Sequence, residues 1–346
     1  MTRDLPEVLR GPLTLPVVAS PMFIASGPDL VLAQCRAGII GSFPALNARP
    51  AGQLSDWLAR ITEELATATA EAPVGPFAVN QIVHRSNNRL DRDVQTCVDH
   101  RVPIVITSLG AQPDVNDAIH SYGGIVLHDV INDRHAHKAI EKGADGLIAV
   151  AAGAGGHAGT TSPFALLREI RSWFDGPLLL SGAIAHGRSI LAAQVAGADL
   201  AYIGSAFLST HEADVVDAYK QMVVDSTAAD IVYSNLFTGV HGNYLRGSIQ
   251  AAGMDPDDLT VSDPTAMSFG SDGDPPTGKA KAWRDIWGSG QGIGAIGRRQ
   301  SAADLVAQLR REYDNALATP VWSGRTGPSS LLTETTSEEP HAEKRQ

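Results

Sequence analysis

The residues with the clearest chemical potential lie between positions 153 and 159, where one imidazole stands among four glycines in the sequence GAGGHAG. This stretch follows a largely apolar run, residues 144–152, which predicts a strand that ends in a loop. Glycines cost conformational entropy, so a cluster of them indicates that backbone lies close to another surface. An imidazole titrates near neutral pH and can take a proton from a substrate. We therefore expect a cofactor site with His157 as catalytic residue; the alternative is a loop histidine that only hydrogen-bonds a neighbouring carbonyl.

Small residues at two further places could bind a phosphate group. Ser181-Gly182 and Gly204-Ser205 each follow an apolar run of strand length. Backbone N–H groups of such turns, backed by a helix that starts near Gly187, form a common phosphate cradle. The two pairs follow the predicted seventh and eighth strands, where barrel enzymes often bind phosphate, and this place favours the interpretation.

Eight apolar runs of about strand length alternate with helical segments as far as about Ser209. Continuous apolar runs are typical of parallel strands that are buried on both faces. Their short connections predict an α/β fold, a closed (β/α)8 TIM barrel with a helical and loop-rich insertion after strand eight, rather than a doubly wound sheet. Gly27-Pro28 and Ser162-Pro163 predict helix starts, and Ser55 predicts an N-cap. The strands are expected to begin near Pro16, Ala37, Phe77, Val102, Gly123, Ala144, Pro177 and Ala198.

Active sites of such barrels lie at the carboxyl ends of the strands, so the residues that end the eight runs form one expected rim. Within it, the amides of Asn80 and Gln81 could meet a ring edge or merely tie down a loop. His128 and His186 are further candidates to face the mouth. The rim comprises Ser20-Pro21-Met22, Ser42-Phe43, Asn80-Gln81, Thr107-Ser108, His128-Asp129, Gly153 to Gly159, Ser181-Gly182-Ala183 and Gly204-Ser205.

The strand and helix alternation ends after strand eight. We expect residues 13–210 and 290–320 to form the barrel, and residues 211–289 to form an inserted cap subdomain over its mouth. A closing amphipathic helix is predicted from Ser301 to Leu317. The tail, residues 323–346, is rich in Ser, Thr, Glu and Pro and is expected to be disordered.

Composition excludes several classes of protein. The chain has 346 residues, 43% of them hydrophobic, and its apolar runs are far shorter than the roughly 20 residues of a spanning helix. The formal charge of -11 disfavours a nucleic-acid surface. No apolar signal segment opens the chain, so we expect a cytoplasmic protein. A homodimer is possible. Cys35 and Cys97 are expected to be buried free thiols, and the spacing of His135 and His137 on a helix predicts no metal site.

The whole segment from about Leu15 to Leu317 resembles the nitronate monooxygenase family, formerly called 2-nitropropane dioxygenases. The resemblance rests on six short motifs that together are specific, although the glycine-histidine loop is shared with related flavin barrels. They are ASPMF at 19–23, GSFPALN at 41–47, NQ at 80–81, AGGHAG at 154–159, SGAI at 181–184 and IGSAF at 203–207.

The resemblance implies an FMN-dependent enzyme that oxidises alkyl nitronates, such as propionate 3-nitronate, with dioxygen. It implies that His157 is the catalytic histidine, which would act as general base on neutral nitroalkanes while FMN accepts the electrons. Gln291 is implied as a contact because the stretch from Trp283 to Gly294 resembles a family segment that returns to the flavin. The other implied flavin contacts are Pro21, Met22, Asn80, Gly155, Gly156, Gly182, Tyr202, Ile203, Gly204 and Ser205.

The sequence departs from the better-studied branch of the family at two places. Val150 or Ala151 stands where that branch has a glutamine, and Ala183 replaces a second glycine. Three other interpretations stay open: an FMN-dependent NAD(P)H enoyl-thioester reductase, a flavin-free phosphate-binding isomerase or aldolase, and a barrel that only carries a ligand.

Overall fold

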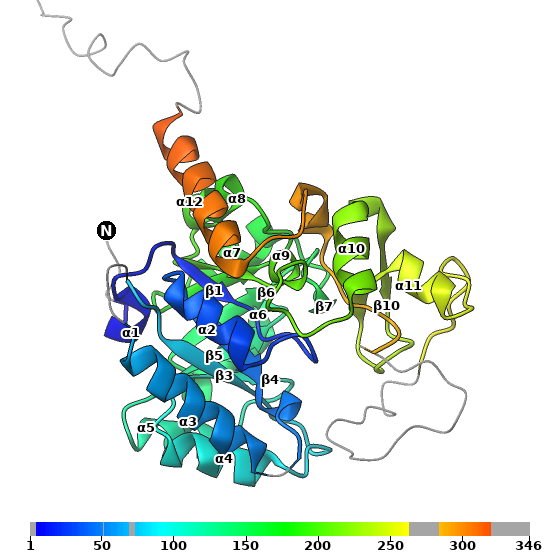
Figure 1. Cartoon of the computed structure of the whole chain (residues 1–346). Helices are drawn as coiled ribbons and strands as arrows, with labels where there is room; N and C mark the ends of the chain where they lie inside the picture. The colour runs from blue at the N-terminus through cyan, green and yellow to red at the C-terminus, as the bar shows by residue number, and fades with distance from the viewer. Residues whose placement is uncertain (1–4, 51, 69–72, 263–283, 320–346) are drawn as a thin grey trace, which may run out of the picture.

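The central feature of the computed structural model, which describes residues 5–50, 52–68, 73–262 and 284–319, is an eight-stranded parallel sheet (Figure 1). The strands follow the order β1-β9-β8-β6-β5-β4-β3-β2. The ring closes where Val18 bridges Ile40 and the amide of Ala19 donates to Ile40 O at 2.8 Å. The predicted closed barrel is confirmed. Its strands are β1 Val17–Ala19, β2 Gly41–Pro44, β3 Phe77–Ile82, β4 Ile104–Ser108, β5 Ile125–Val130, β6 Gly146–Val150, β8 Leu178–Ser181 and β9 Leu200–Ile203.

Helices surround this sheet and begin largely where local chemistry predicts. Gly27 precedes α2, Ser162 precedes α7, and both helices have proline in the first turn. The predicted cap at Ser55 is wrong, because α3 begins two residues earlier, after Gly52 with φ 96°. The helices of the barrel are α1 Glu7–Arg10, α2 Pro28–Arg36, α3 Gln53–Ala66, α4 Leu90–Asp99, α5 Pro113–His120, α6 Asp133–Glu141, α7 Pro163–Arg171, α8 Gly187–Ala196, α9 Ser205–Leu208 and α12 Ala302–Ala318, with short 3-10 turns η1 Ala45–Asn47 and η4 Gln291–Ala295.

The hydrophobic core has an inner and an outer layer. Inward side chains such as Ile104, Ile148 and Leu179 fill the barrel, and none of them is exposed. Outward side chains pack against the helices in two larger clusters. Cys35 and Cys97 lie in the outer layer as buried free thiols, as expected, and burial raises the pKa of each to about 12.

The insertion after strand eight contains strands that the sequence did not predict. It holds α10 Asp217–Asp225, η2 Ala228–Asp230, β10 Ile231–Ser234, β11 Gly242–Leu245 and α11 Arg246–Ala251. β10 and β11 form an antiparallel sheet whose third strand is β7, Gly156–His157, from the barrel. The insertion is therefore tied by backbone pairing to the glycine-histidine loop.

After the insertion the chain returns to the barrel and forms α12, which packs on α8 and α2 (Figure 1). Ser301 caps α12 by accepting a hydrogen bond from the amide of Asp304 at 3.0 Å, which confirms the predicted closing helix. The tail expected to be disordered, residues 323–346, lies outside the described residues.

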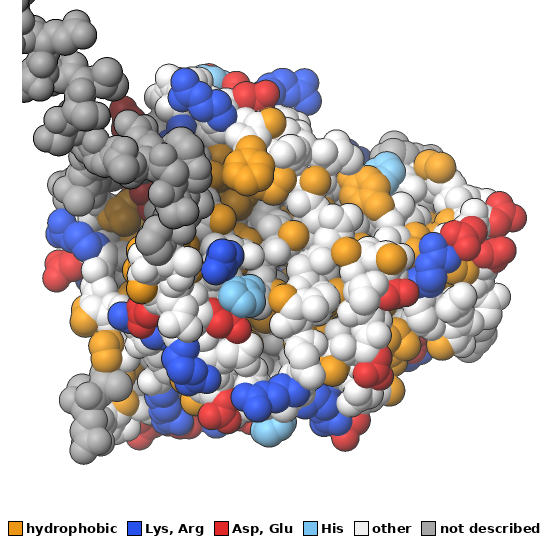
Figure 2. Space-filling model, turned by 90° about the horizontal axis from the view of Figure 1, so that it is seen from above, with side chains coloured by type: hydrophobic (Ala, Val, Ile, Leu, Met, Phe, Trp, Pro, Cys, Tyr) orange, Lys and Arg blue, Asp and Glu red, His pale blue; other side chains and the backbone are white. Residues whose placement is uncertain are grey.

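None of the described helices combines the length and apolar character that crossing a bilayer requires. On the face shown in Figure 2, acidic and basic side chains of the described residues are interspersed along the margin, and uncharged and hydrophobic side chains occupy much of the centre.

Candidate active site

Inward-facing side chains at the carboxyl ends of the strands form the floor of a cavity of about 790 Å³. Side chains of a strand alternate between its two faces. Ala78 and Ile106 pack inside the barrel, so the residues two positions further along face inward at the mouth. The floor residues placed in this way are Asn80, Ser108, Asp129, Val150, Ser181 and Tyr202.

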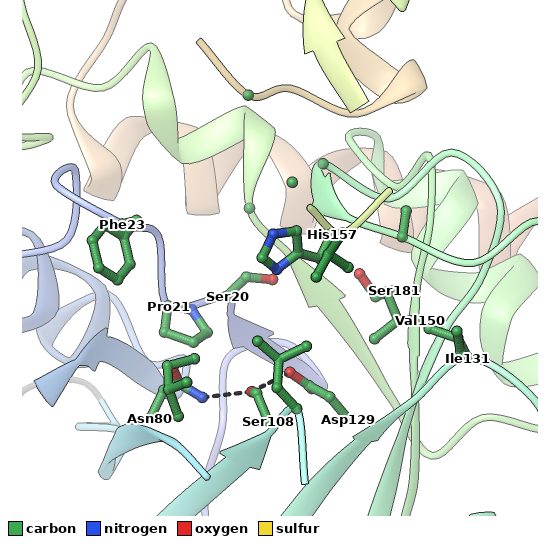
Figure 3. A pocket seen from close by; sticks show the side chains of 18 of the residues that line it. Ser20, Pro21, Phe23, Asn80, Ser108, Asp129, Ile131, Val150, His157 and Ser181 are labelled. Carbon is green, nitrogen blue, oxygen red and sulfur yellow. Dashed lines mark hydrogen bonds between the residues drawn. The ribbon is translucent and has the colours of Figure 1, made fainter. Parts of the chain in front are cut away.

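Three floor residues form a hydrogen-bonded chain that runs in one direction (Figure 3). Asn80 Nδ2 donates to Ile106 O at 3.1 Å and to Ser108 Oγ at 2.7 Å, which uses both of its hydrogens. Ser108 Oγ donates in turn to Asp129 Oδ2 at 2.6 Å. The side chain of Asn80 therefore presents only its carbonyl oxygen to a ligand, as a hydrogen-bond acceptor.

Asp129 is the single carboxylate among the described residues that line the cavity. Burial raises its pKa to about 6, although the hydrogen bond from Ser108 lowers it in part. Oδ1 of Asp129 is buried and accepts no hydrogen bond from the described part of the chain. The floor therefore gains its negative charge only above about pH 6.

His157 lies above this floor, on the β7 strand that the insertion holds in place (Figure 3). In the pairing of β7 with β11, His157 stands opposite Gly242. Asn243 of β11 donates from its side chain to Ala154 O at 2.6 Å. Two segments far apart in the sequence thus fix the position of the imidazole.

The imidazole of His157 is half-buried and neutral at physiological pH. Burial is the cause that lowers its pKa to about 4. Its Nε2 lies 3.0 Å from Oγ1 of Thr238, a residue of the loop between β10 and β11. A neutral imidazole has one acceptor nitrogen, so His157 can take a proton without first losing one.

The glycines around His157 serve two purposes. Gly155 and Gly156 line the cavity, as predicted for a loop that exposes its backbone. A Cβ on Gly155 would lie 2.9 Å from the amide of Gly290 and 3.0 Å from Ser205 Oγ. Part of the glycine content is therefore explained by close packing against the segment around Gly290, not by a ligand.

Three other rim candidates do not face the mouth of the barrel. Gln81 points outward and donates to Cys97 Sγ at 3.3 Å. His128 also lies on the outer face of its strand, where its Nδ1 is 2.6 Å from Thr107 Oγ1, although it is among the residues that line the cavity. His186 caps α8 by accepting from the amide of Arg188 at 3.0 Å.

Comparison with known sequences gives the family. Residues 43–312 match the family described as nitronate monooxygenase. The chain belongs to this family. It is therefore an enzyme of the oxidoreductase class, and members of the nitronate monooxygenase family are in general flavin enzymes.

The individual relatives compared with this chain are distant. The nitronate monooxygenase of Paraburkholderia phytofirmans is 24% identical over 354 residues, which cover 87% of this chain and 93% of the relative. An octahydroindene-carboxyl-CoA dehydrogenase of Mycobacterium tuberculosis is 28% identical over 247 residues, 69% of this chain. The chain spans 66% of that relative's length and 60% of the length of another M. tuberculosis relative.

The fold also matches a solved structure. The nitroalkane oxidase of Streptomyces ansochromogenes superimposes with a TM-score of 0.73 and 24% sequence identity, over 90% of this chain and 99% of that structure. At this identity the likeness supports the barrel fold.

A second, small pocket lies beside the cavity and contains the glycines and serines predicted to hold a phosphate. Gly182, Gly204 and Ser205 line it, together with Gly290 and Gly292 of the returning segment. The amide of Gly290 donates to Ser205 Oγ at 2.8 Å, so the pocket is closed by a fixed segment. A Cβ on Gly204 would come within 3.3 Å of Ser20, so a larger residue there would crowd the cavity.

The predicted backing of this pocket by the start of α8 is wrong. The amide of Gly187 donates to Glu312 Oε2 of α12 at 2.8 Å. A side chain of α12 therefore occupies the start of α8, and neither Gly187 nor His186 lines the cavity or the small pocket.

The remaining predicted flavin contacts fall into two groups. Pro21, Met22 and Tyr202 line the cavity together with Asn80. Ile203 packs outward in the core, so its side chain does not reach the cavity. Gln291 packs beside Gly153, whose added Cβ would lie 3.0 Å from Gln291 Oε1, and Gln291 does not line the cavity. Trp283, the start of the stretch that pointed to Gln291, lies outside the described residues.

The structure adds lining residues from the insertion that the sequence did not single out. Tyr233, Asn235 and His241 reach the cavity from β10 and the loop before β11. Tyr233 Oη donates to Ala158 O at 2.9 Å, next to His157. No motif marks these residues, and only the pairing of β11 with β7 brings them to the site.

Proposed function

We propose that the protein binds FMN in this cavity and oxidises alkyl nitronates, such as propionate 3-nitronate, with dioxygen. The observation that carries the proposal is the neutral imidazole of His157, held above a polar floor inside a cavity with glycine backbone in its wall. Membership of the nitronate monooxygenase family supports the reaction class.

The residues present fit a flavin mononucleotide. The cavity of about 790 Å³ lies within the usual range of cofactor and ligand sites, about 300–1,000 Å³. Asn80 offers an acceptor oxygen that suits an N–H group on a ring edge. Gly182, Gly204 and Ser205 would hold the phosphate, and Met22 and Gly156 would flank the ring.

His157 supplies the proton chemistry in this proposal. When bound, FMN provides the electron acceptor that no side chain offers. Neutral His157 would remove the acidic proton from the carbon that bears the nitro group and leave a nitronate anion in the cavity. General bases of this kind contribute about 10²–10⁴-fold to a rate. A nitronate that enters already deprotonated does not need this step.

An absorption spectrum of the purified protein, followed by oxygen uptake with propionate 3-nitronate, tests the proposal. We expect a bound yellow flavin that acid releases as FMN, and oxygen consumption that depends on the nitronate. A colourless protein that retains no added FMN would contradict the cofactor assignment. Full FMN occupancy without oxygen uptake would contradict the substrate assignment.

An NAD(P)H-dependent enoyl-thioester reductase is the second candidate, and one observation favours it. Three side chains that can carry positive charge line the cavity: His135 and Lys138 of α6, and Lys142 directly after it. They could bind the phosphates of a thioester carrier. The M. tuberculosis relative named as a carboxyl-CoA dehydrogenase supports such a substrate. Anaerobic bleaching of the flavin by NADPH would favour this candidate, and no bleaching would favour the nitronate oxidase.

We further propose that two parts of the chain have different roles. Residues 13–210 and 290–320 would bind FMN, and residues 211–289 would act as a cap that positions His157.

The buried free thiols of Cys35 and Cys97 are compatible with a reducing cytoplasm. Gel filtration would distinguish a monomer from a homodimer.

A further inference from the structure

We infer that Thr238 sets the tautomer of His157, so that Nε2 carries the hydrogen of the neutral ring and Nδ1 carries its lone pair. The inference rests on the proposed role of His157 as a base and adds to it a named atom. It makes Thr238, a residue of the insertion, a positioning residue for chemistry at the barrel mouth.

The hydrogen bonds around Thr238 carry this inference. Its Oγ1 lies 3.0 Å from His157 Nε2 and 3.0 Å from the carbonyl oxygen of Val240. A carbonyl oxygen can only accept a hydrogen bond, so the single hydroxyl hydrogen of Thr238 is directed to Val240. Oγ1 then turns its lone pairs toward the imidazole, and the short contact requires a hydrogen on Nε2.

The protonation state of His157 completes the step. Burial lowers its pKa to about 4, so the ring carries one hydrogen at neutral pH. If that hydrogen is on Nε2, the lone pair is on Nδ1. In the opposite tautomer, lone pairs of Nε2 and Oγ1 would face each other at 3.0 Å unless the hydroxyl gave up Val240. The geometry thus disfavours the Nδ1–H form.

Nitrogen NMR of the flavin-loaded protein labelled with ¹⁵N-histidine measures the tautomer directly, independently of activity. His157→Gln identifies the resonances of His157 by their loss. We expect Nε2–H in the native protein and in Thr238→Ser, which keeps the hydroxyl. In Thr238→Val, which keeps the shape and lacks the hydroxyl, we expect a rise in the Nδ1–H form. A native protein in the Nδ1–H form, or an unchanged tautomer in Thr238→Val, would overturn the inference.

Kinetics of the same variants separate this inference from the proposed function. Thr238→Val should lower kcat for a neutral nitroalkane about three- to tenfold, in line with the loss of one hydrogen bond, and Thr238→Ser should restore it. Turnover of the preformed nitronate should change by less than about twofold, because that substrate needs no base. Equal loss on both substrates would contradict a role through His157. Absence of turnover with every nitro compound, together with the Nε2–H tautomer, would overturn the proposed function and leave the tautomer assignment supported.

Discussion

Replacement of Asp129 by Asn is expected to change how the stability of the protein depends on pH. The carboxyl of Asp129 has a pKa of about 6 in the folded chain against an ordinary value of 3.8, because it is buried. A carboxyl whose folded pKa is raised binds its proton more tightly in the folded state. Its contribution to stability is complete below about pH 3.8 and is lost as the pH rises through about 6.

The size of the effect follows from the two pKa values. The difference is about two units, and each unit corresponds to about 1.4 kcal/mol. Asn cannot ionise, so Asp129→Asn avoids this loss. The free energy of unfolding of the variant, minus that of the native protein, should therefore rise by about 2.5 kcal/mol between about pH 4 and about pH 8. Asp129→Asn also weakens the hydrogen bond from Ser108, but this lowers the free energy of unfolding equally at both pH values. It therefore does not change the difference between them.

Urea unfolding of the flavin-free protein, followed by tryptophan fluorescence across this pH range, provides the measurement. Glu64→Gln is a control of opposite sign, because hydrogen bonds from Arg60 and Arg36 lower the pKa of Glu64. Its stability relative to the native protein should fall as the pH rises. A difference for Asp129→Asn that stays constant with pH within about 0.5 kcal/mol would refute the reasoning.

Three further outcomes follow from the structure. In an Asp129→Asn background, turnover of neutral nitroalkanes should persist to about pH 5, since the pKa of His157 is about 4; a pH profile that falls with an apparent pKa above about 6 would disagree. Gly204→Val should weaken FMN binding about tenfold or more by crowding Ser20, whereas Gly294→Ala, with open space around it, should bind FMN normally in the same fluorescence titration. Arg171→Met should lower unfolding stability by about 3–5 kcal/mol, because it removes the guanidinium that balances the charge of buried Asp199, and should leave KM unchanged; native-like urea stability would count against this ion pair.

Much of the barrel could be predicted because burial on both faces leaves a direct trace in the sequence. Each of the eight apolar runs contains a strand of the sheet, for example the run from Phe77, where β3 begins. The carboxyl ends of parallel strands lie on one side, so the same runs also predict the rim that includes Asn80 and Ser108.

The direction of individual side chains could not be predicted in the same way. Asn80 and Gln81 are adjacent amides, and only the register of β3 decides that Asn80 faces the cavity while Gln81 meets Cys97. His186 similarly ends an apolar run but serves as a helix cap. A run of apolar residues has no alternation that would mark its inner face.

The insertion was the least predictable part of the site. β7 has two residues, and β10 and β11 have four each, which is too short for a clear period of two. The contact of Thr238 with His157 joins positions 81 residues apart. Such a contact depends on tertiary pairing, and no local pattern announces it.

The most direct test of the account compares His157→Asn with the native enzyme on a neutral nitroalkane and on its preformed nitronate, in protein shown to hold equal flavin. We expect a loss of about 100-fold or more on the nitroalkane, the usual contribution of a general base, and a loss of less than about tenfold on the nitronate. Equal losses on the two substrates would contradict the assignment of His157 as the base.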